Sequence, residues 1–561
     1  MRTLCIVLPG IVLFCACAVR AEIRPPHTLL FSPITPEYLQ DTAGQWKATG
    51  FDGFLLSGIM RNWSDDVWAT DGDGTTRGED DQTFKRIKTC NDECRKRGIT
   101  ENFVKVAFYS HVPLWTDDAA WAKCTRNFYE AARFARMTGC RGVALDIEYV
   151  GEQYDLDWEG YEYKGYTQAE LREAAVRRGR DLAKAMLDGY PDMVYLTLPE
   201  GIRYYGPLAT DLFVGFFQGM AEANAPGGLH LLTEHSYKMV STLGLIHYVH
   251  ALETEIFNHL DKSSAQYWKK TCSIVLGGWP LGYYRDILDE DGNRLGYSGR
   301  VEKFGNKIVG SYADKSRNYS PEDFRNQYAG MLLGGKKYCW IYGHGATWWH
   351  FTEADVARYG KVSNATLPVD KQLDAFKSVL RAKWMSAERI QTLSEKVRRY
   401  ESDEFVQMLG FVERFQVIGP FGGQGVDCFH TVYPPERRID SSDWKTASAD
   451  STGYLNFLDH LSPTDWVCAY AWCKVFSPKA RSAQIRLGTN DTATLWFNGE
   501  KILSKNIERS AAPDSDILPI QLRKGENTVL IKVCNTEFNW GLYLRISDPD
   551  GIALKDLIFQ P

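Results

Sequence analysis

The chain has 561 residues, too many for one compact domain, and its length predicts two or three. Its 65 basic and 71 acidic side chains are well mixed along the sequence and give a formal charge of -6. Because no basic stripe is present that would hold a phosphate backbone, we expect no nucleic-acid partner. The sequence does not indicate an oligomeric state.

The amino terminus predicts export. Met1 and Arg2 are followed by an almost unbroken apolar segment from Leu4 to Val19, and then by Ala21. This pattern is typical of a secretion signal over residues 1–21, so we expect a secreted or periplasmic protein. A lipid anchor at the signal cysteines is the alternative, although they fit a bacterial lipobox poorly. No other segment approaches the roughly 20 apolar residues of a helical membrane span.

Strand-like runs alternate with amphipathic helical segments up to about Trp349, a pattern that gives a parallel sheet through right-handed crossovers. A helix is predicted from Asp117 to Gly139, and another begins at Ser320-Pro321. Eight strand–helix pairs predict an α/β fold, a (β/α)8 TIM barrel over residues 22–368. The eight runs are Thr28–Ser32, Gly53–Ser57, Phe103–Ser110, Gly142–Tyr149, Met193–Pro199, Gly228–His235, Cys272–Trp279 and Lys337–Tyr342.

The carboxyl-terminal part has a different pattern. Residues 369–411 are charged and helical, with Leu373, Phe376 and Leu380 on one face, and predict a helical connector. Short alternating stretches then predict an all-β, jelly-roll-like sandwich over residues 412–561. The segments LWFNG, KGEN and WGL within it resemble galactose-binding-like domains of secreted carbohydrate enzymes. This resemblance implies a domain that supports the barrel or helps to hold a glycan.

Ten cysteines remain outside the signal, and an even number in an exported chain permits disulfides. Cys90 and Cys94 lie one helical turn apart and could pair with Cys124 and Cys140 or, less readily, bind zinc with them. Small buried thiols are the simpler interpretation. The pairing is not readable from the sequence.

The fourth run, RGVALDIEYV (residues 141–150), ends in two carboxylates one residue apart. Because strand side chains alternate, Asp146 and Glu148 share one face with Ala144, while Val143 and Leu145 point the other way. Acids at the carboxyl end of a barrel strand lie where such folds keep their active sites. A salt bridge at the barrel rim is the alternative for these acids.

Other polar and aromatic side chains follow the remaining runs at the same end of the barrel. Acids and imidazoles hydrogen-bond to hydroxyls, and indole and phenol rings cover the apolar face of a sugar. We therefore expect a carbohydrate substrate, an oligo- or polysaccharide, and no cofactor or metal. The expected substrate-binding residues are Trp63, Tyr109, His111, Glu200, His235, Trp279, Tyr342 and His344.

The segment GVALDIEY also resembles the fourth-strand signature of chitinase-type barrels, family 18 of the glycoside hydrolases. This resemblance implies that Glu148 is the general acid and Asp146 its partner. Two earlier aspartates of that signature correspond here to Arg141 and Ala144, so the N-acetyl-assisted mechanism is not carried over.

A second carboxylate is needed unless the substrate supplies its own nucleophile. Glu234, at the end of the sixth run, is our choice, and barrels that pair acids of strands four and six resemble α-galactosidases. Glu200 is the rival, and a rim salt bridge remains open for both. The sequence leaves retaining and inverting hydrolysis open.

Two other classes of function remain. His111, Asp146, Glu148, His235 and His344 could bind a divalent metal in a barrel deacetylase or amidohydrolase, although no His-x-His pair lies on the first run. A non-catalytic carbohydrate-binding protein would keep the aromatic residues and lose the acids, which are present here. The sequence therefore favours an exported glycoside hydrolase.

Overall fold

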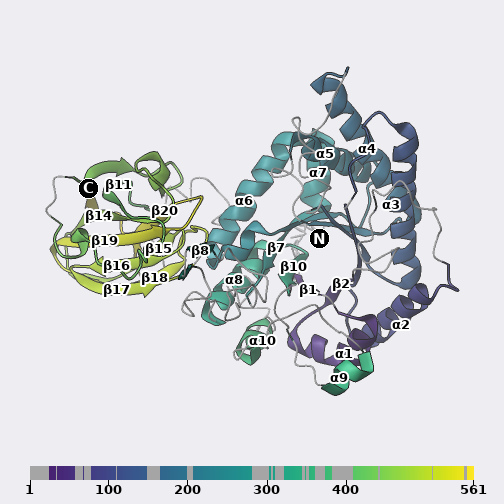
Figure 1. Ribbon diagram of the computed structural model, residues 1–561, viewed down its shortest axis with the longest axis horizontal. Coiled ribbons are helices and arrows are strands. Elements are labelled where there is room, and N and C mark those ends of the chain that lie inside the picture. The colour runs from purple at the N-terminus through teal and green to yellow at the C-terminus, as the bar shows by residue number, and fades with distance from the viewer. Residues whose placement is uncertain are drawn as a thin grey trace, which may run out of the picture.

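The computed structural model shows two bodies of regular structure, a barrel of parallel strands and a pair of antiparallel sheets (Figure 1). It describes residues 25–32, 34–56, 67, 78–108, 110–147, 165–198, 206–280, 302–304, 307–309, 321–343, 348, 353–359, 373–381, 409–439, 443–507, 509–548 and 553–561.

Eight parallel strands close into a barrel in the order β1-β10-β7-β6-β5-β4-β3-β2. Ala107 lies opposite Asp146 between β3 and β4, and Phe31 lies opposite Tyr342 where the barrel closes. The eight predicted strands all form, with ends within a few residues of those expected, and the TIM barrel is confirmed. The strands are β1 His27–Phe31, β2 Gly53–Leu56, β3 Phe103–Ala107, β4 Gly142–Asp146, β5 Val194–Leu198, β6 Leu229–Thr233, β7 Ser273–Gly278 and β10 Tyr338–Tyr342.

Helices cover the outside of the barrel (Figure 1). The predicted helix α3 begins after Asp117, whose carboxylate accepts the N–H groups of the first turn, and ends at Gly139 with φ +80°. Its apolar face, which includes Trp121 and Phe128, is buried. The helices are α1 Pro36–Thr49, α2 Gln82–Lys96, α3 Asp118–Thr138, α4 Gln168–Gly189, α5 Pro207–Glu222, α6 Thr242–His259, α7 Lys262–Thr271, α8 Pro321–Gly334, α9 Glu353–Tyr359 and α10 Leu373–Arg381.

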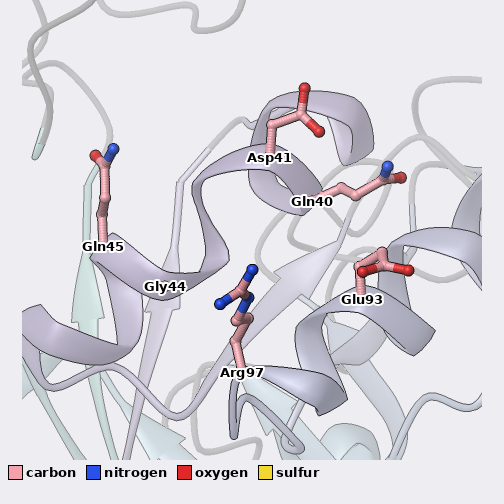
Figure 2. A pocket seen from close by; sticks show the side chains of 6 residues that line it. All are labelled: Gln40, Asp41, Gly44, Gln45, Glu93 and Arg97. Carbon is pink, nitrogen blue, oxygen red and sulfur yellow. The ribbon is translucent and has the colours of Figure 1, made fainter.

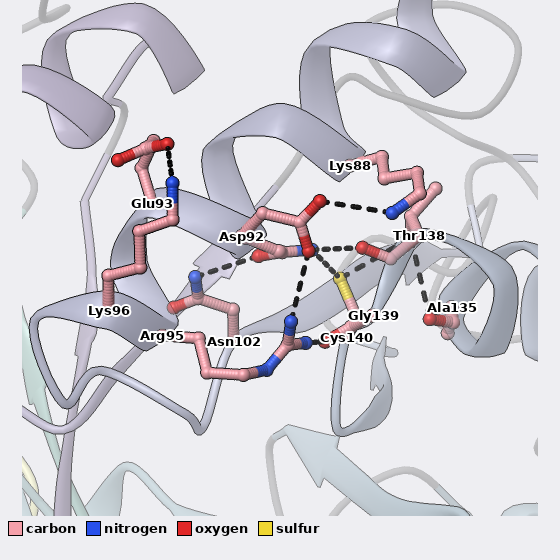
Figure 3. Close-up of polar contacts among 11 residues, drawn as sticks. Lys88, Asp92, Glu93, Arg95, Lys96, Asn102, Ala135, Thr138, Gly139 and Cys140 are labelled. Atoms are coloured by element: carbon pink, nitrogen blue, oxygen red, sulfur yellow. Dashed lines mark hydrogen bonds and ion pairs between the residues drawn. The ribbon is translucent and has the colours of Figure 1, made fainter.

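Buried amides fix the edge of the barrel where the strands begin (Figure 3). Asn91 of α2 donates through Nδ2 to the carbonyl of Thr138 at 2.9 Å, and its Oδ1 accepts from Asn102 Nδ2 at 2.9 Å. The Oδ1 atom of Asn102 in turn accepts the N–H of Phe54 at 2.9 Å. These bonds satisfy buried polar groups between α2, α3 and the sheet, and they stabilise the edge opposite the expected active site.

The carboxyl-terminal region forms two antiparallel sheets, ordered β12-β11-β14-β19-β16-β17 with β21 beside β14, and β13-β20-β15-β18. Apolar residues from both sheets, such as Val417, Ile485 and Leu542, form one core, which confirms the predicted all-β sandwich. The strands are β11 Arg414–Gly422, β12 Lys445–Ser448, β13 Tyr454–Asn456, β14 Val467–Ser477, β15 Arg481–Thr489, β16 Ala493–Phe497, β17 Glu500–Lys505, β18 Asp516–Leu522, β19 Gly525–Asn535, β20 Gly541–Ser547 and β21 Ile558–Gln560. The domain boundaries given above stay predictions, and the signal lies outside the described residues.

A short hairpin of β8 (Glu302–Phe304) and β9 (Lys307–Val309) lies between β7 and α8 in chain order. The ten cysteines outside the predicted signal are buried, and none of them forms a disulfide. Within the described ranges, no helix combines the length and apolarity that crossing a membrane requires.

Candidate active site

Asp146 ends β4 inside the barrel and forms an ion pair with Lys105 of β3. The distance from Lys105 Nζ to Asp146 Oδ2 is 2.6 Å, and the two side chains are 6% and 4% exposed. Alternation along β4 places Ala144 in the core inside the barrel, while Val143 and Leu145 pack toward the helices, as predicted. Because buried charges are stable only when they are paired, the ammonium group of Lys105 stabilises a carboxylate at this position.

Aromatic rings cover the interior of the barrel near this pair. The Tyr342 ring packs against Phe31 at 5.5 Å, edge-on against Trp279 at 4.7 Å, and parallel to Tyr237 at 6.0 Å between centroids. Lys105 Nζ lies 5.4 Å from the centroid of the Phe31 ring, which joins the cluster to the ion pair. Trp279 is only 3% exposed, whereas Tyr342 is half-buried. Tyr342 is therefore the more accessible ring of this pair.

Glu234 follows β6 on a tightly held turn. Its side chain is half-buried, and Tyr237 donates its hydroxyl to Glu234 Oε1 at 3.4 Å. The next residues form the short 3-10 helix η2 (His235–Lys238), in which Ser236 Oγ donates to the carbonyl of Gly277 on β7 at 2.8 Å. The turn is thus tied to the neighbouring strand directly beside the carboxylate.

A fully buried glutamine of α8 holds the same turn from the helix side. Gln327 Nε2 lies within hydrogen-bond distance of three carbonyl oxygens, those of Ser236 (3.1 Å), Tyr237 (2.9 Å) and Met239 (3.1 Å). Its two N–H groups are therefore shared among the turns of η2. The backbone after Glu234 is fixed at both its strand side and its helix side.

The described part of the chain places Asp146, Glu234, Trp279 and Tyr342 at the carboxyl ends of their strands, as expected. His111 and His235 are exposed. The other predicted site residues lie outside the described residues, and their roles stay predictions: Glu148, Trp63, Tyr109, Glu200 and His344.

Among the described residues, no group of three or more His, Cys, Asp and Glu side chains is arranged to hold a metal ion. Of the ligands considered from the sequence, Asp146 is engaged by Lys105 at 2.6 Å. His111 and His235 are exposed on the segments that follow β3 and β6.

A surface depression of about 430 Å³ lies elsewhere, between α1 and α2 (Figure 2). Arg97, after the end of α2, extends toward α1, and Glu93 and Gln40 lie beside it. The residues that line the depression are polar or glycine, and none of them is aromatic. Since the last turns of barrel helices lie near the edge where strands begin, this depression is remote from the carboxyl-terminal mouth.

Lys105 and Gln327 are not among the residues predicted from the sequence. Lys105 lies on the inward face of β3, as Phe103 does. Strand alternation predicts this position from the sequence, and a lysine that points into a barrel core indicates a buried acidic partner. Gln327 carries no such signal, because a single amide on a helix is ordinarily a surface residue.

The chain matches no protein-family model and no curated protein sequence. Solved structures match it at low similarity. An α-amylase from Geobacillus thermoleovorans complexed with acarbose is 9% identical, covers 90% of this chain and 98% of that chain, and has a TM-score of 0.34. A GH27 β-L-arabinopyranosidase from Geobacillus stearothermophilus in complex with arabinose is 10% identical, covers 92% of this chain and 98% of that chain, and has a TM-score of 0.32. A D-allulose 3-epimerase from Methylomonas sp. is 13% identical, covers 65% of this chain and 99% of that chain, and has a TM-score of 0.31.

The class of fold, a closed (β/α)8 barrel followed by antiparallel sheets, rests on the strand pairing itself.

Proposed function

We propose that the chain is an exported glycoside hydrolase that cleaves glycosidic bonds of an oligo- or polysaccharide by carboxylate acid/base catalysis. The observation that carries this proposal is the buried, ion-paired Asp146 beside the Phe31–Tyr342 aromatic pair, with half-buried Glu234 two strands away. A fixed negative charge stabilises an oxocarbenium-like transition state, and aromatic rings cover the apolar face of the sugar.

In the proposed mechanism, Glu148 protonates the leaving oxygen and Asp146 is its charged partner. Glu234 is the second carboxylate, which acts as nucleophile or as base for water. Neighbouring strands are about 4.8 Å apart, so the axes of β4 and β6 are separated by about 10 Å. Side chains that point inward from these strands can bring their carboxyl groups to within roughly 5–10 Å, the separation of paired acids in glycosidases.

Substrate binding is proposed for the residues that follow the strands. Tyr342, which is half-buried beside Phe31, and Trp279 would contact the sugar ring. The remaining proposed contacts are Trp63, Tyr109, His111, Glu200, His235 and His344.

The test is hydrolysis of a panel of oligo- and polysaccharides by the wild type and by Glu148→Gln. We expect wild-type turnover of at least one glycan and a loss of about 10²-fold or more in kcat for Glu148→Gln, with glycan affinity retained, because general acid catalysis contributes about 10²–10⁴-fold. Glu222→Gln, at the end of α5, where the glutamate is 48% exposed and pairs with Lys184 at 3.0 Å, is the matched control and should keep the activity. Retained turnover in Glu148→Gln would remove Glu148 from the mechanism.

Two further measurements extend this test. A chelator should leave the activity unchanged. Loss of activity in the presence of the chelator would favour a metal-dependent hydrolase. The anomeric configuration of the first product, followed by NMR, distinguishes carboxyl groups about 5–5.5 Å apart, which retain configuration, from those about 6.5–9.5 Å apart, which invert it.

A further inference from the structure

The sandwich contacts the barrel directly after the turn that carries Glu234. We call residues 234–241 the strand-six loop and residues 509–516 of the sandwich the docking loop. Ser241, which caps α6 by accepting the N–H of Gly244 at 3.0 Å, donates its hydroxyl to the carbonyl of Pro513. A Cβ atom on Gly244 would overlap the Cβ of Ala512. The first turn of α6 and the docking loop are thus in direct contact.

The docking loop is held rigidly by buried arginines of the sandwich. Arg509, 1% exposed, donates to Asp516 Oδ2 at 2.6 Å and to Thr489 Oγ1 at 2.8 Å. Asp514 accepts from Arg486 at 2.8 Å and from Arg545 Nε at 2.7 Å. Breaking buried pairs of this kind is costly, so Ala512 and Pro513 are presented to the barrel on a stiff support.

A second contact reaches the same loop through α8. Lys505 of the sandwich pairs with Asp323 of α8 at 2.7 Å and with Asp516 at 3.3 Å. One helical turn after Asp323, Gln327 holds the carbonyl groups of the strand-six loop. Figure 1 shows α6 and α8 on the side of the barrel that faces the sandwich. Both helices that fix the strand-six loop therefore carry a contact from the sandwich.

We infer that the sandwich is part of the catalytic unit, because its docking loop and Lys505 fix the strand-six loop and thereby position Glu234. Ala512, Pro513 and Lys505 are positioning residues, since they act on Glu234 through Ser241, Asp323 and Gln327. This inference rests on the proposed function for the role of Glu234, whereas the fixation of the loop is independent of it.

Substitutions that exchange the sizes of the side chains at Gly244 and Ala512, where α6 meets the docking loop, test the inference in the full chain. Gly244→Ala is favoured by helix propensity but adds a methyl group against Ala512. Gly244→Ala with Ala512→Gly returns the space. Gly44→Ala in α1, where an added Cβ meets nothing within 4 Å, is the matched control.

The readouts are hydrogen exchange of amides 234–241 and steady-state kinetics on a hydrolysed glycan. We expect Gly244→Ala to accelerate exchange in this segment and to lower kcat by about tenfold or more with little change in KM, because small misplacement of a catalytic group costs up to about 10²-fold. The double variant should restore both quantities, and Gly44→Ala should change neither.

Unchanged exchange in a folded Gly244→Ala variant, or a double variant that restores nothing, would overturn the inference. If Gly244→Ala does not fold, Ala512→Gly alone loosens the contact and should accelerate exchange in the same segment; unchanged exchange there also overturns it. If exchange responds as expected while the wild type hydrolyses no glycan, the fixation of the loop stands and the proposed function fails.

Discussion

The Lys105–Asp146 pair is buried, so its removal has a predictable energetic cost. Lys105→Met leaves the Asp146 carboxylate, 4% exposed, without the ammonium at 2.6 Å. We expect the free energy of unfolding to fall by about 3–5 kcal/mol, the usual cost of removing one partner from a buried ion pair. Urea denaturation followed by tryptophan fluorescence measures this change.

Two controls separate burial from loss of a lysine. Lys105→Met with Asp146→Asn removes both charges and should recover much of the stability. Lys88→Met breaks an exposed pair with Asp92, whose side chains are 52% and 42% exposed, and should cost less than about 1 kcal/mol. A Lys105→Met variant as stable as Lys88→Met would contradict the assigned ion pair.

His230 is a second buried ionisable residue, inside the barrel near the edge where the strands begin. Its Nε2 lies 3.0 Å from the carbonyl of Gly227, which can only accept, so Nε2 carries the proton and Nδ1 accepts from Ser273 Oγ at 2.8 Å. Burial, together with the charges of Lys337 and Arg141, lowers the pKa of His230 from 6.5 to about 3. The folded protein therefore keeps this imidazole neutral in mild acid.

This lowered pKa predicts a pH-dependent loss of stability. Between pH 6.5 and 3 the unfolded chain binds a proton at His230 and the folded chain does not. The contribution of neutral His230 to the free energy of unfolding is therefore fully present above pH 6.5, and it decreases by about 1.4 kcal/mol per pH unit as the pH falls below that value. The difference in unfolding free energy between the wild type and His230→Gln should therefore shrink from pH 7 to pH 4.5. A difference that is independent of pH would show that His230 is not buried in the neutral form.

At the scale of elements, the sequence was sufficient to predict the barrel. Parallel strands buried on both faces appear as short apolar runs, and all eight predicted runs became barrel strands. Helix α3 was equally readable, because Asp117 and Gly139 mark its two ends. These signals are local, so they do not depend on which elements meet in space.

The site was only partly predictable for the same reason. Asp146 and Glu234 could be placed together because all strands of a parallel barrel end at one edge. Lys105, however, reaches Asp146 from the middle of β3, and Gln327 reaches Ser236 from 91 residues away. Such contacts depend on side-chain reach and helix placement, which periodicity does not encode.

At the scale of the whole molecule, the contact between barrel and sandwich predicts linked unfolding. Lys505, 25% exposed, joins Asp323 of the barrel to Asp516 of the sandwich, whose side chains are 9% and 7% exposed. The charges of Arg509 and Lys505 outweigh burial and lower the pKa of Asp516, so its carboxylate remains a charged partner. Lys505 is thus the shared cation of the interface.

Lys505→Met should weaken this link by about 1.5–3 kcal/mol, the usual value of hydrogen bonds to charged groups. Asp516 keeps Arg509 at 2.6 Å, so the sandwich should retain most of its own stability while the barrel loses a partner for α8. In differential scanning calorimetry we therefore expect the barrel transition to move to lower temperature and to separate from that of the sandwich. Lys474→Met, which breaks the exposed pair with Glu526 inside the sandwich, should leave the barrel transition in place. Identical profiles for the two variants would mean that the sandwich does not stabilise the barrel through Lys505.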